Sequence, residues 1–206
     1  MTRPLRPLAL VGVLVVAVSD PAAAQNTPRF TPADVRFMQG MIGHHAQALA
    51  MTALIPDRTD RRDIRLLGER IEVSQKDEIK LMQQWLRDRH QQVPAIDATN
   101  SLTVARHMNM PGMSMTDTLM PGMLTSEQLG ELAKARGTDF DKLFLSDMIR
   151  HHEGALVMVA QLLGTTASGQ EPEVFRFAAE VDTDQRAEIA RMNALLATLR
   201  PSGATP

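Results

Sequence analysis

Hydrophobic residues recur with a helical period in four long stretches of the chain. They return every three or four positions, which places them on one face of an α-helix, in residues 32–54, 59–90, 139–164 and 172–199. Thr31 before Pro32 is a typical helix start, and Pro172 can begin the last helix in the same way. Because four such helices bury their apolar faces most simply against one another, the pattern predicts an all-α fold, a four-helix bundle.

The second half of the chain repeats the first. A shift of 107 positions aligns "DVRFMQGMIGHHAQALAMTAL" (34–54) with "DKLFLSDMIRHHEGALVMVAQ" (141–161). A shift of 110 aligns "IEVSQKDEIKLMQQWL" (71–86) with "VDTDQRAEIARMNALL" (181–196). The repeated unit is thus a pair of helices used twice. We predict one domain over residues 30–199, made of copy one at 30–90, a Met-rich linker at 91–124 and copy two at 125–199.

The linker concentrates methionine among Pro, Gly, Ser and Thr and has no helical period. After it, "TSEQ" (125–128) has the letters of a capping box, which predicts a short helix that Gly137 can close. Apolar side chains gain little in a loop, so methionines gathered there indicate soft metal ligands. The candidates are His107, Met108, Met110, Met113, Met115, Met120 and Met123. The alternative is a lid that packs its methionines on the helices.

Residues 1–24 have the layout of a secretory signal peptide. Arg3 and Arg6 precede an apolar run from Leu8 to Val18, and small residues follow up to Ala24, where cleavage is expected. The apolar run is too short to span a bilayer comfortably, and no other stretch approaches the required length. We therefore expect a periplasmic or secreted protein without a membrane span in its mature part.

The composition excludes several classes of site and partner. The chain has no cysteine, so disulfides, thiolate metal sites and covalent haem attachment are excluded. Without residues 1–24 the formal charge is −3, which favours neither nucleic acid nor an anionic membrane. Fourteen methionines against six Phe and no Tyr indicate a helical interior rich in thioethers.

Two nearly identical words hold four of the six histidines: "MIGHH" at 41–45 and "MIRHH" at 148–152. On a helix, the histidines share the apolar face with methionines one or two turns away. Side chains that project into a helical bundle are typical metal ligands. The candidates are Met41, His44, His45, Met51, Met148, His151, His152 and Met158. The alternative is that methionine fills the core and the histidines bond to a facing Glu or Gln.

The second helix of each copy offers polar partners for these histidines. Glu78 and Met82 share one face with Gln75, and Glu188 and Met192 share the corresponding face with Gln185. Since a Gln or Glu on an apolar face needs a partner there, we expect these residues to support the ligands rather than bind the ion themselves.

The ligand types select the metal. Imidazole and thioether without thiolate suit copper, and Cu(I) more than Cu(II), because soft sulfur prefers the softer ion. Calcium and magnesium prefer oxygen ligands, and a di-iron site of the bundle type needs Glu-x-x-His, which the chain lacks.

Several stretches resemble the domain-of-unknown-function 305 family, exported bacterial proteins with a ferritin-like helical bundle, some of them associated with copper binding or resistance. They are "FLSDMIRHHEGALVMV", "QRAEIARMNALL" and "MPGMLTSEQLGELAKARGTDFDKLF". The resemblance covers roughly residues 30–199 and implies as candidate ligands His44, His45, His151, His152, Met41, Met51, Met148 and Met158. Copy one departs from the pattern, with Gly40 opposite Asp147 and Gly43 opposite Arg150. Asp147 is placed to orient His151, which favours the second site.

We therefore predict an exported copper-binding protein, a Cu(I) buffer or carrier in copper tolerance, which could pass the ion to a copper-exporting partner protein. No catalytic site is predicted, because the chain lacks the nucleophile, phosphate-loop and zinc-protease motifs. Two alternatives remain open: a ferritin-like metal-dependent oxidase, and a metal-free interaction module of the cell envelope.

Overall fold

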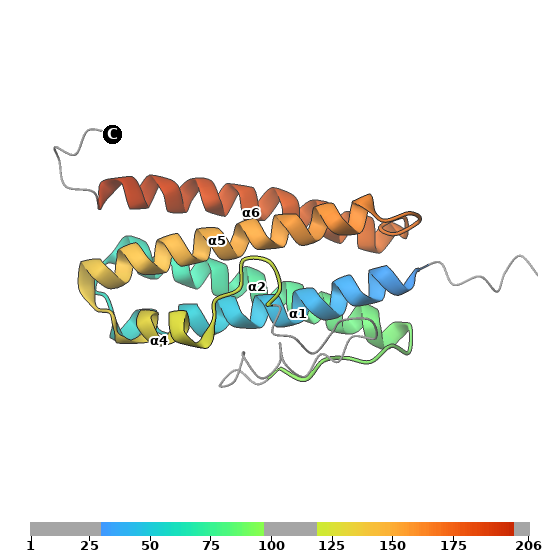
Figure 1. Cartoon of the computed structure of the whole chain (residues 1–206), viewed down its shortest axis with the longest axis horizontal. Helices are drawn as coiled ribbons and strands as arrows, with labels where there is room; N and C mark the ends of the chain where they lie inside the picture. The colour runs from blue at the N-terminus through green and yellow to red at the C-terminus, as the bar shows by residue number, and fades with distance from the viewer. Residues whose placement is uncertain (1–29, 97–118, 200–206) are drawn as a thin grey trace, which may run out of the picture.

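The computed structural model describes residues 30–96 and 119–199, and every regular element in these two ranges is helical. The all-α prediction is therefore confirmed. Four long helices lie side by side with a short helix and a 3₁₀ turn (Figure 1). Their bounds are α1 Pro32–Thr52, η2 Ile55–Asp57, α2 Arg62–Asp88, α4 Ser126–Lys134, α5 Gly137–Gly164 and α6 Pro172–Thr198. None of the described helices is both long and apolar enough to cross a membrane.

The helix starts follow the predicted capping chemistry. Thr31 caps α1 in a capping box, in which its hydroxyl accepts from the Asp34 amide and its own amide donates to Asp34. Thr125 caps α4 in the same way with Gln128. Pro172 occupies the first turn of α6, where a missing amide proton leaves no hydrogen bond unmade.

One predicted helix end is wrong. Gly137 does not close α4, which ends at Lys134, but opens α5 with a φ of +55°. Its amide donates to the carbonyl of Arg58 at 2.7 Å, so this left-handed residue lets the chain turn against the loop between α1 and α2. That loop contains η2, which the sequence pattern did not predict.

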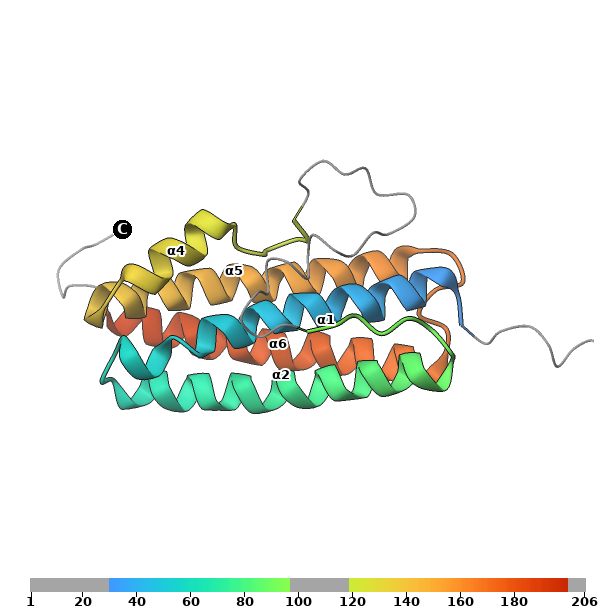
Figure 2. The ribbon, with the colours of Figure 1, turned by 90° about the horizontal axis from the view of Figure 1, so that it is seen from below.

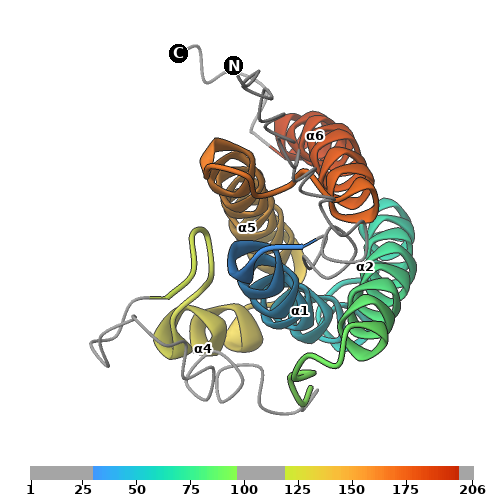
Figure 3. The same ribbon diagram turned by 90° about the vertical axis from the view of Figure 1, so that its right-hand side faces the viewer.

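The helices pack in the order α2, α1, α5, α6. α1 packs on α2 and α5, and α5 packs on α6. α1 and α5 run in opposite directions through the centre, while α2 and α6 face each other on one side (Figures 1 and 3). The chain that leads into α4 lies on the other side, against α1 and α5 (Figures 2 and 3).

The apolar core divides into two clusters. The first contains Phe37, Trp85 and Phe177, and the second contains Phe140, Phe144 and Leu132. Each cluster contains buried methionines from α1, from α5 and from one outer helix. These are Met38, Met41, Met158 and Met82 in the first cluster, and Met51, Met148 and Met192 in the second. The methionines of each cluster therefore come from both halves of the sequence repeat.

Candidate metal centre

The four histidines of the repeated words form one buried layer between the two apolar clusters. His44, His45 and His152 are 0 % exposed and His151 is 1 % exposed. His44 on α1 and His151 on α5 meet at the centre, with ring centroids 3.8 Å apart and ring planes inclined by 35°. His45 and His152 lie outside this pair, their centroids 6.4 and 6.2 Å from those of their chain neighbours. The two words are thus brought face to face by the opposite directions of α1 and α5.

Each outer histidine is hydrogen-bonded to a glutamate from the outer helix of its own copy. His45 Nε2 lies 2.5 Å from Glu78 Oε2 on α2, and His152 Nε2 lies 2.6 Å from Glu188 Oε2 on α6. The other oxygen of Glu78 accepts from the Ser74 hydroxyl at 2.9 Å. These bonds fix the ring orientation of both outer histidines, the arrangement usual for supported metal ligands.

Burial keeps the two central imidazoles neutral. Desolvation, helped by the neighbouring His45, lowers the pKa of His44 to about 3, although the bond to Pro121 acts in the opposite direction. Desolvation together with the other three histidines lowers the pKa of His151 well below its usual value of 6.5. Burial alone would raise the pKa of Glu78, but the hydrogen bond and charge of His45 outweigh it and lower that pKa.

Four imidazole nitrogens of this layer have no hydrogen-bond partner in the described structure. They are Nδ1 of His44, His45 and His152, and Nε2 of His151. A buried polar atom left unpaired costs about 1–3 kcal/mol, so four in one layer call for an occupant. Imidazole nitrogens together with buried thioethers are a donor set that suits copper. The residues present therefore fit the ion that their types predict.

The side chains do not already converge on a point. Among the described residues, no three His, Asp or Glu are placed to hold one ion. A bound copper would therefore need a thioether in its ligand set or a rotation of the rings. Each central histidine has a methionine one turn before it, Met41 on α1 and Met148 on α5, and both are fully buried.

A short segment of the linker, residues 120–124, closes the layer on the α1–α5 side. His44 Nε2 donates to the Pro121 carbonyl at 2.9 Å. Gly122, with a φ of +75°, lies against Gly154 so closely that a Cβ on Gly154 would stand 2.0 Å from the Pro121 oxygen. The Gln47 amide holds Leu124 by two bonds, accepting from its N–H at 2.7 Å and donating to its carbonyl at 3.0 Å. We call residues 120–124 the strap.

The strap contacts on the helices were not predicted from the sequence. Gln47 and Gly154 correspond to each other under the shift of 107, and both hold the strap. The sequence did contain a sign of these contacts, because the two copies differ at this position, which lies close to the histidines in both. Because one strap must lie across two similar helices, the two positions need different side chains.

The predicted linker ligands divide into two groups. His107, Met108, Met110, Met113 and Met115 lie outside the described residues. Met120 packs on the first apolar cluster, and Met123 is 6 % exposed. Met120 therefore packs on the helices, as the lid alternative expects, and Met123 is buried.

The residues predicted to support the ligands are buried or partly buried, and most of them lie on the outer helices α2 and α6. Met82 and Met192 are fully buried in the two clusters, and the side-chain oxygens of Gln75 and Gln185 are buried without a partner in the described structure. Asp147 is bonded to Arg150 at 3.0 Å, and no hydrogen bond between Asp147 and His151 is found among the described residues. The contact from which stronger metal binding by the second copy was expected is therefore not observed among the described residues.

Comparison with solved structures finds close relatives of the fold. A DUF305 fragment from Deinococcus radiodurans matches with a TM-score of 0.65 and 29% identity, covering 83% of this chain and 99% of that one. A DUF305 protein from Streptomyces coelicolor, described as a candidate secreted protein, matches with a TM-score of 0.64 and 28% identity, covering 81% and 93%. CopM in its Cu(II)-bound form matches with a TM-score of 0.59 and 25% identity, covering 81% and 97%, and its Cu(I)-bound form matches similarly.

A search of the curated proteins finds no match to the chain. The sequence matches the family described as "Domain of unknown function (DUF305)" over residues 34–196, which takes in all four long helices and the histidine layer. The chain belongs to the DUF305 family.

Proposed function

We propose that this protein binds copper in the histidine layer and that it serves as an exported copper buffer or carrier. The observation that carries the proposal is the set of four buried imidazole nitrogens without partners in the described structure, which lie between two apolar clusters that both contain buried methionines. CopM, a relative with the same helical arrangement, is described in Cu(II)-bound and Cu(I)-bound forms. The donor types of this chain favour Cu(I).

The ligands would come from α1 and α5, and α2 and α6 would support them. His44, His45, His151 and His152 offer nitrogen, and Met41, Met51, Met148 and Met158 offer sulfur. Because these donors are buried, bound copper would be held away from direct contact with redox partners. Glu78 and Glu188 keep the outer rings oriented, and their negative charges offset the charge that the ion brings into an apolar interior.

A four-helix bundle built from a duplicated pair of helices accounts for this layer. Asp34 on α1 accepts from the Gly169 amide in the α5–α6 loop at 2.6 Å, and Asp141, its counterpart under the shift of 107, is bonded to Thr59 in the α1–α2 loop. Thr59 and Gly169 correspond under the shift of 110. This reciprocal pairing supports a common origin of copy one (30–90) and copy two (125–199).

The rest of the proposal concerns export and the linker. Residues 1–24 would act as a signal peptide cleaved near Ala24, in agreement with the description of the Streptomyces relative. The linker residues His107, Met108, Met110, Met113 and Met115 would offer a second, thioether-rich site, from which a copper-exporting partner could take the ion.

The test is native mass spectrometry of the mature protein after anaerobic addition of Cu(I), followed by competition with a chromophoric Cu(I) chelator. The double variants His44→Ala/His45→Ala and His151→Ala/His152→Ala should each lose the tight ion, while the matched surface variant His90→Ala keeps it. Circular dichroism shows whether each variant stays folded. Full copper retention in both folded double variants contradicts the proposal.

The oxidase alternative is tested on the same samples. A metal-dependent oxidase consumes oxygen when Fe(II) or Cu(I) is added with a reductant, whereas a buffer takes up the ion and then consumes none. Sustained oxygen consumption that the histidine variants abolish would contradict the buffer function and support the oxidase function.

A further inference from the structure

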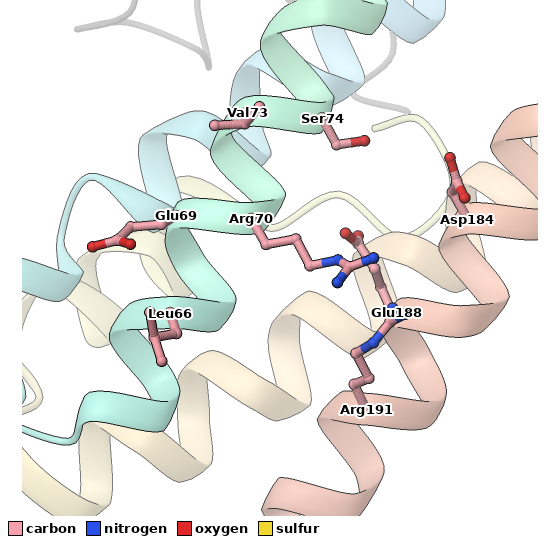
Figure 4. A pocket seen from close by; sticks show the side chains of 8 residues that line it. All are labelled: Leu66, Glu69, Arg70, Val73, Ser74, Asp184, Glu188 and Arg191. Atoms are coloured by element: carbon pink, nitrogen blue, oxygen red, sulfur yellow. The ribbon is translucent and has the colours of Figure 1, made fainter.

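A groove of about 470 Å³ lies between α2 and α6, on the side of the molecule opposite the strap. α2 packs on α1 and α6 packs on α5, but these two outer helices are not closely packed against each other, which leaves the groove between them. Figure 4 shows side chains from both helices along it. Its rim on α2 is formed by Leu66 and Val73, which are 53 % and 62 % exposed.

The inner wall of the groove consists of the groups that support the outer histidines. Glu188, which is bonded to His152, lines the groove directly. Ser74 also lines it and donates to Glu78, which is bonded to His45. Glu188 therefore connects the groove to His152 through one hydrogen bond. Ser74 connects the groove to His45 through two hydrogen bonds, by way of Glu78. Both halves of the histidine layer are reached from this single side.

The opposite side of the layer is closed by backbone. His44 Nε2 already donates its hydrogen bond to the Pro121 carbonyl of the strap. Gly122 lies so close to Gly154 that a methyl group on Gly154 would not fit between them. Gln47 fixes the next residue of the strap by two hydrogen bonds. An ion entering from that side would have to break these contacts, whereas the groove on the α2–α6 side already reaches Ser74 and Glu188.

The groove is lined by both acidic and basic side chains, so it can attract a cation and also oppose its passage. Asp184 at the rim and Glu188 deeper inside attract a cation, whereas Arg70 and Arg191 repel it. Figure 4 shows Arg70 extending from α2 toward Glu188 and Arg191 on α6. A long, flexible arginine at this point can swing aside, so it can act as a gate and not as a permanent plug.

We infer that the α2–α6 groove is the route by which a copper ion passes between solvent and the histidine layer, with Asp184 and Glu188 as successive contacts and Arg70 as a gate. This inference rests on the proposed copper binding. A route, unlike a ligand, has a definite kinetic signature. Narrowing it slows uptake and release by the same factor and leaves the dissociation constant unchanged, because the bound and free states are not altered.

The steric test uses Val73→Trp, which narrows the rim, and Leu81→Trp as its control. Leu81 lies on the same helix, is 58 % exposed and does not line the groove. Uptake is measured by anaerobic stopped flow with Cu(I) in acetonitrile solution. Release is measured with excess bicinchoninate, in the range where the rate no longer depends on its concentration. We expect Val73→Trp to slow both by about tenfold, within the span that association rates show among variants of one site, and Leu81→Trp to match the wild type.

The electrostatic test uses Arg70→Gln with Arg62→Gln as its control, since both arginines are exposed on α2. Removing the positive charge from the groove should speed uptake several-fold at low salt, and the gain should shrink as salt rises, because screening weakens the interaction. Arg62→Gln should change uptake little.

The outcomes separate the inference from the function on which it rests. A wild-type protein that takes up no Cu(I) overturns both. Normal copper affinity with Val73→Trp rates equal to those of Leu81→Trp overturns the route alone. A changed dissociation constant with an unchanged uptake rate also overturns it, since the residue would then act on the bound state. Equal slowing of uptake and release in a variant with wild-type melting supports the route.

Discussion

Gly154 is the residue at which a single methyl group should dislodge the strap. Its Cβ would stand 2.0 Å from the Pro121 oxygen, 2.4 Å from the Pro121 carbonyl carbon and 2.7 Å from Gly122 Cα. All three atoms are backbone, so no side chain can rotate away. In Gly154→Ala the strap must therefore shift as a whole or leave α5.

Two opposed terms set the size of the effect. Replacing glycine by alanine within a helix stabilises it by about 1 kcal/mol. Shifting the strap strains a packed contact, for about 1–3 kcal/mol, and weakens the bond from His44, whose buried nitrogen would then be unpaired, for about 1–3 kcal/mol more. We expect a net destabilisation of about 2 kcal/mol, which lowers the melting temperature by roughly 4–8 °C in a chain of this length.

The assay is thermal and urea unfolding of the metal-free protein followed by circular dichroism. Gly130→Ala is the matched control, because Gly130 lies within α4 and a Cβ there meets nothing within 4 Å. It should gain up to about 1 kcal/mol. If Gly154→Ala is as stable as Gly130→Ala, the strap does not close on α5 and the account of a sealed side is refuted.

Three further predictions concern protons, carboxylates and the linker. Since the pKa of His44 is about 3 and that of His151 is also depressed, the unfolded chain takes up these two protons below about pH 6.5 while the native protein does not. The metal-free protein should thus lose about 3 kcal/mol of stability between pH 6.5 and 5.0, measured by urea unfolding, and His44→Gln/His151→Gln should flatten this slope whereas His90→Gln should leave it. Glu188→Gln should weaken Cu(I) binding by roughly tenfold in a chelator competition, because His152 loses its charged partner, and Glu180→Gln on the exposed face of α6 should have no effect. Changing Met108, Met110, Met113 and Met115 together to Leu should lower the number of bound Cu(I) ions in native mass spectra without changing the melting temperature, and a large drop in melting temperature with full copper would mean that these residues pack instead.

The helices could be predicted because each signal in the sequence is local. Thr31 and Pro32 predict the start of α1 where it is observed, and the structure adds Asp34, which completes a capping box with Thr31. Gly137 shows where local reasoning fails. A glycine after a helix is usually its end, but here it begins the next helix because its amide bonds to Arg58, nearly eighty positions away in the sequence.

The histidine layer could be predicted in composition but not in geometry. The repeated words placed four histidines on the buried faces of two helices, and all four are buried together. The sequence could not show that the tilted rings of His44 and His151 meet at the centre, between the two outer histidines. That follows from the opposite directions of α1 and α5 and from their register, which tertiary packing decides.

The strap and the groove lie where the two copies differ, and this connects the fold to the proposed function. A perfect repeat of two helix pairs would present the same residues from α1 and α5 to the strap, and the same residues from α2 and α6 to the groove. Gln47 opposite Gly154 in the repeat allows a strap to seal the α1–α5 side, and Ser74 opposite Asp184 gives the α2–α6 side a hydroxyl near one glutamate and a carboxylate at the rim near the other. The repeat thus supplies the candidate ligands in pairs, while its departures provide the side chains that hold the strap on one side of the layer and line the groove on the other. A variant that restores the repeat at one of these positions is therefore a sharper probe of function than one that removes a ligand. Asp184→Ser makes the rim match Ser74, and it should slow copper uptake at low salt while the helices, the histidines and the strap are left in place.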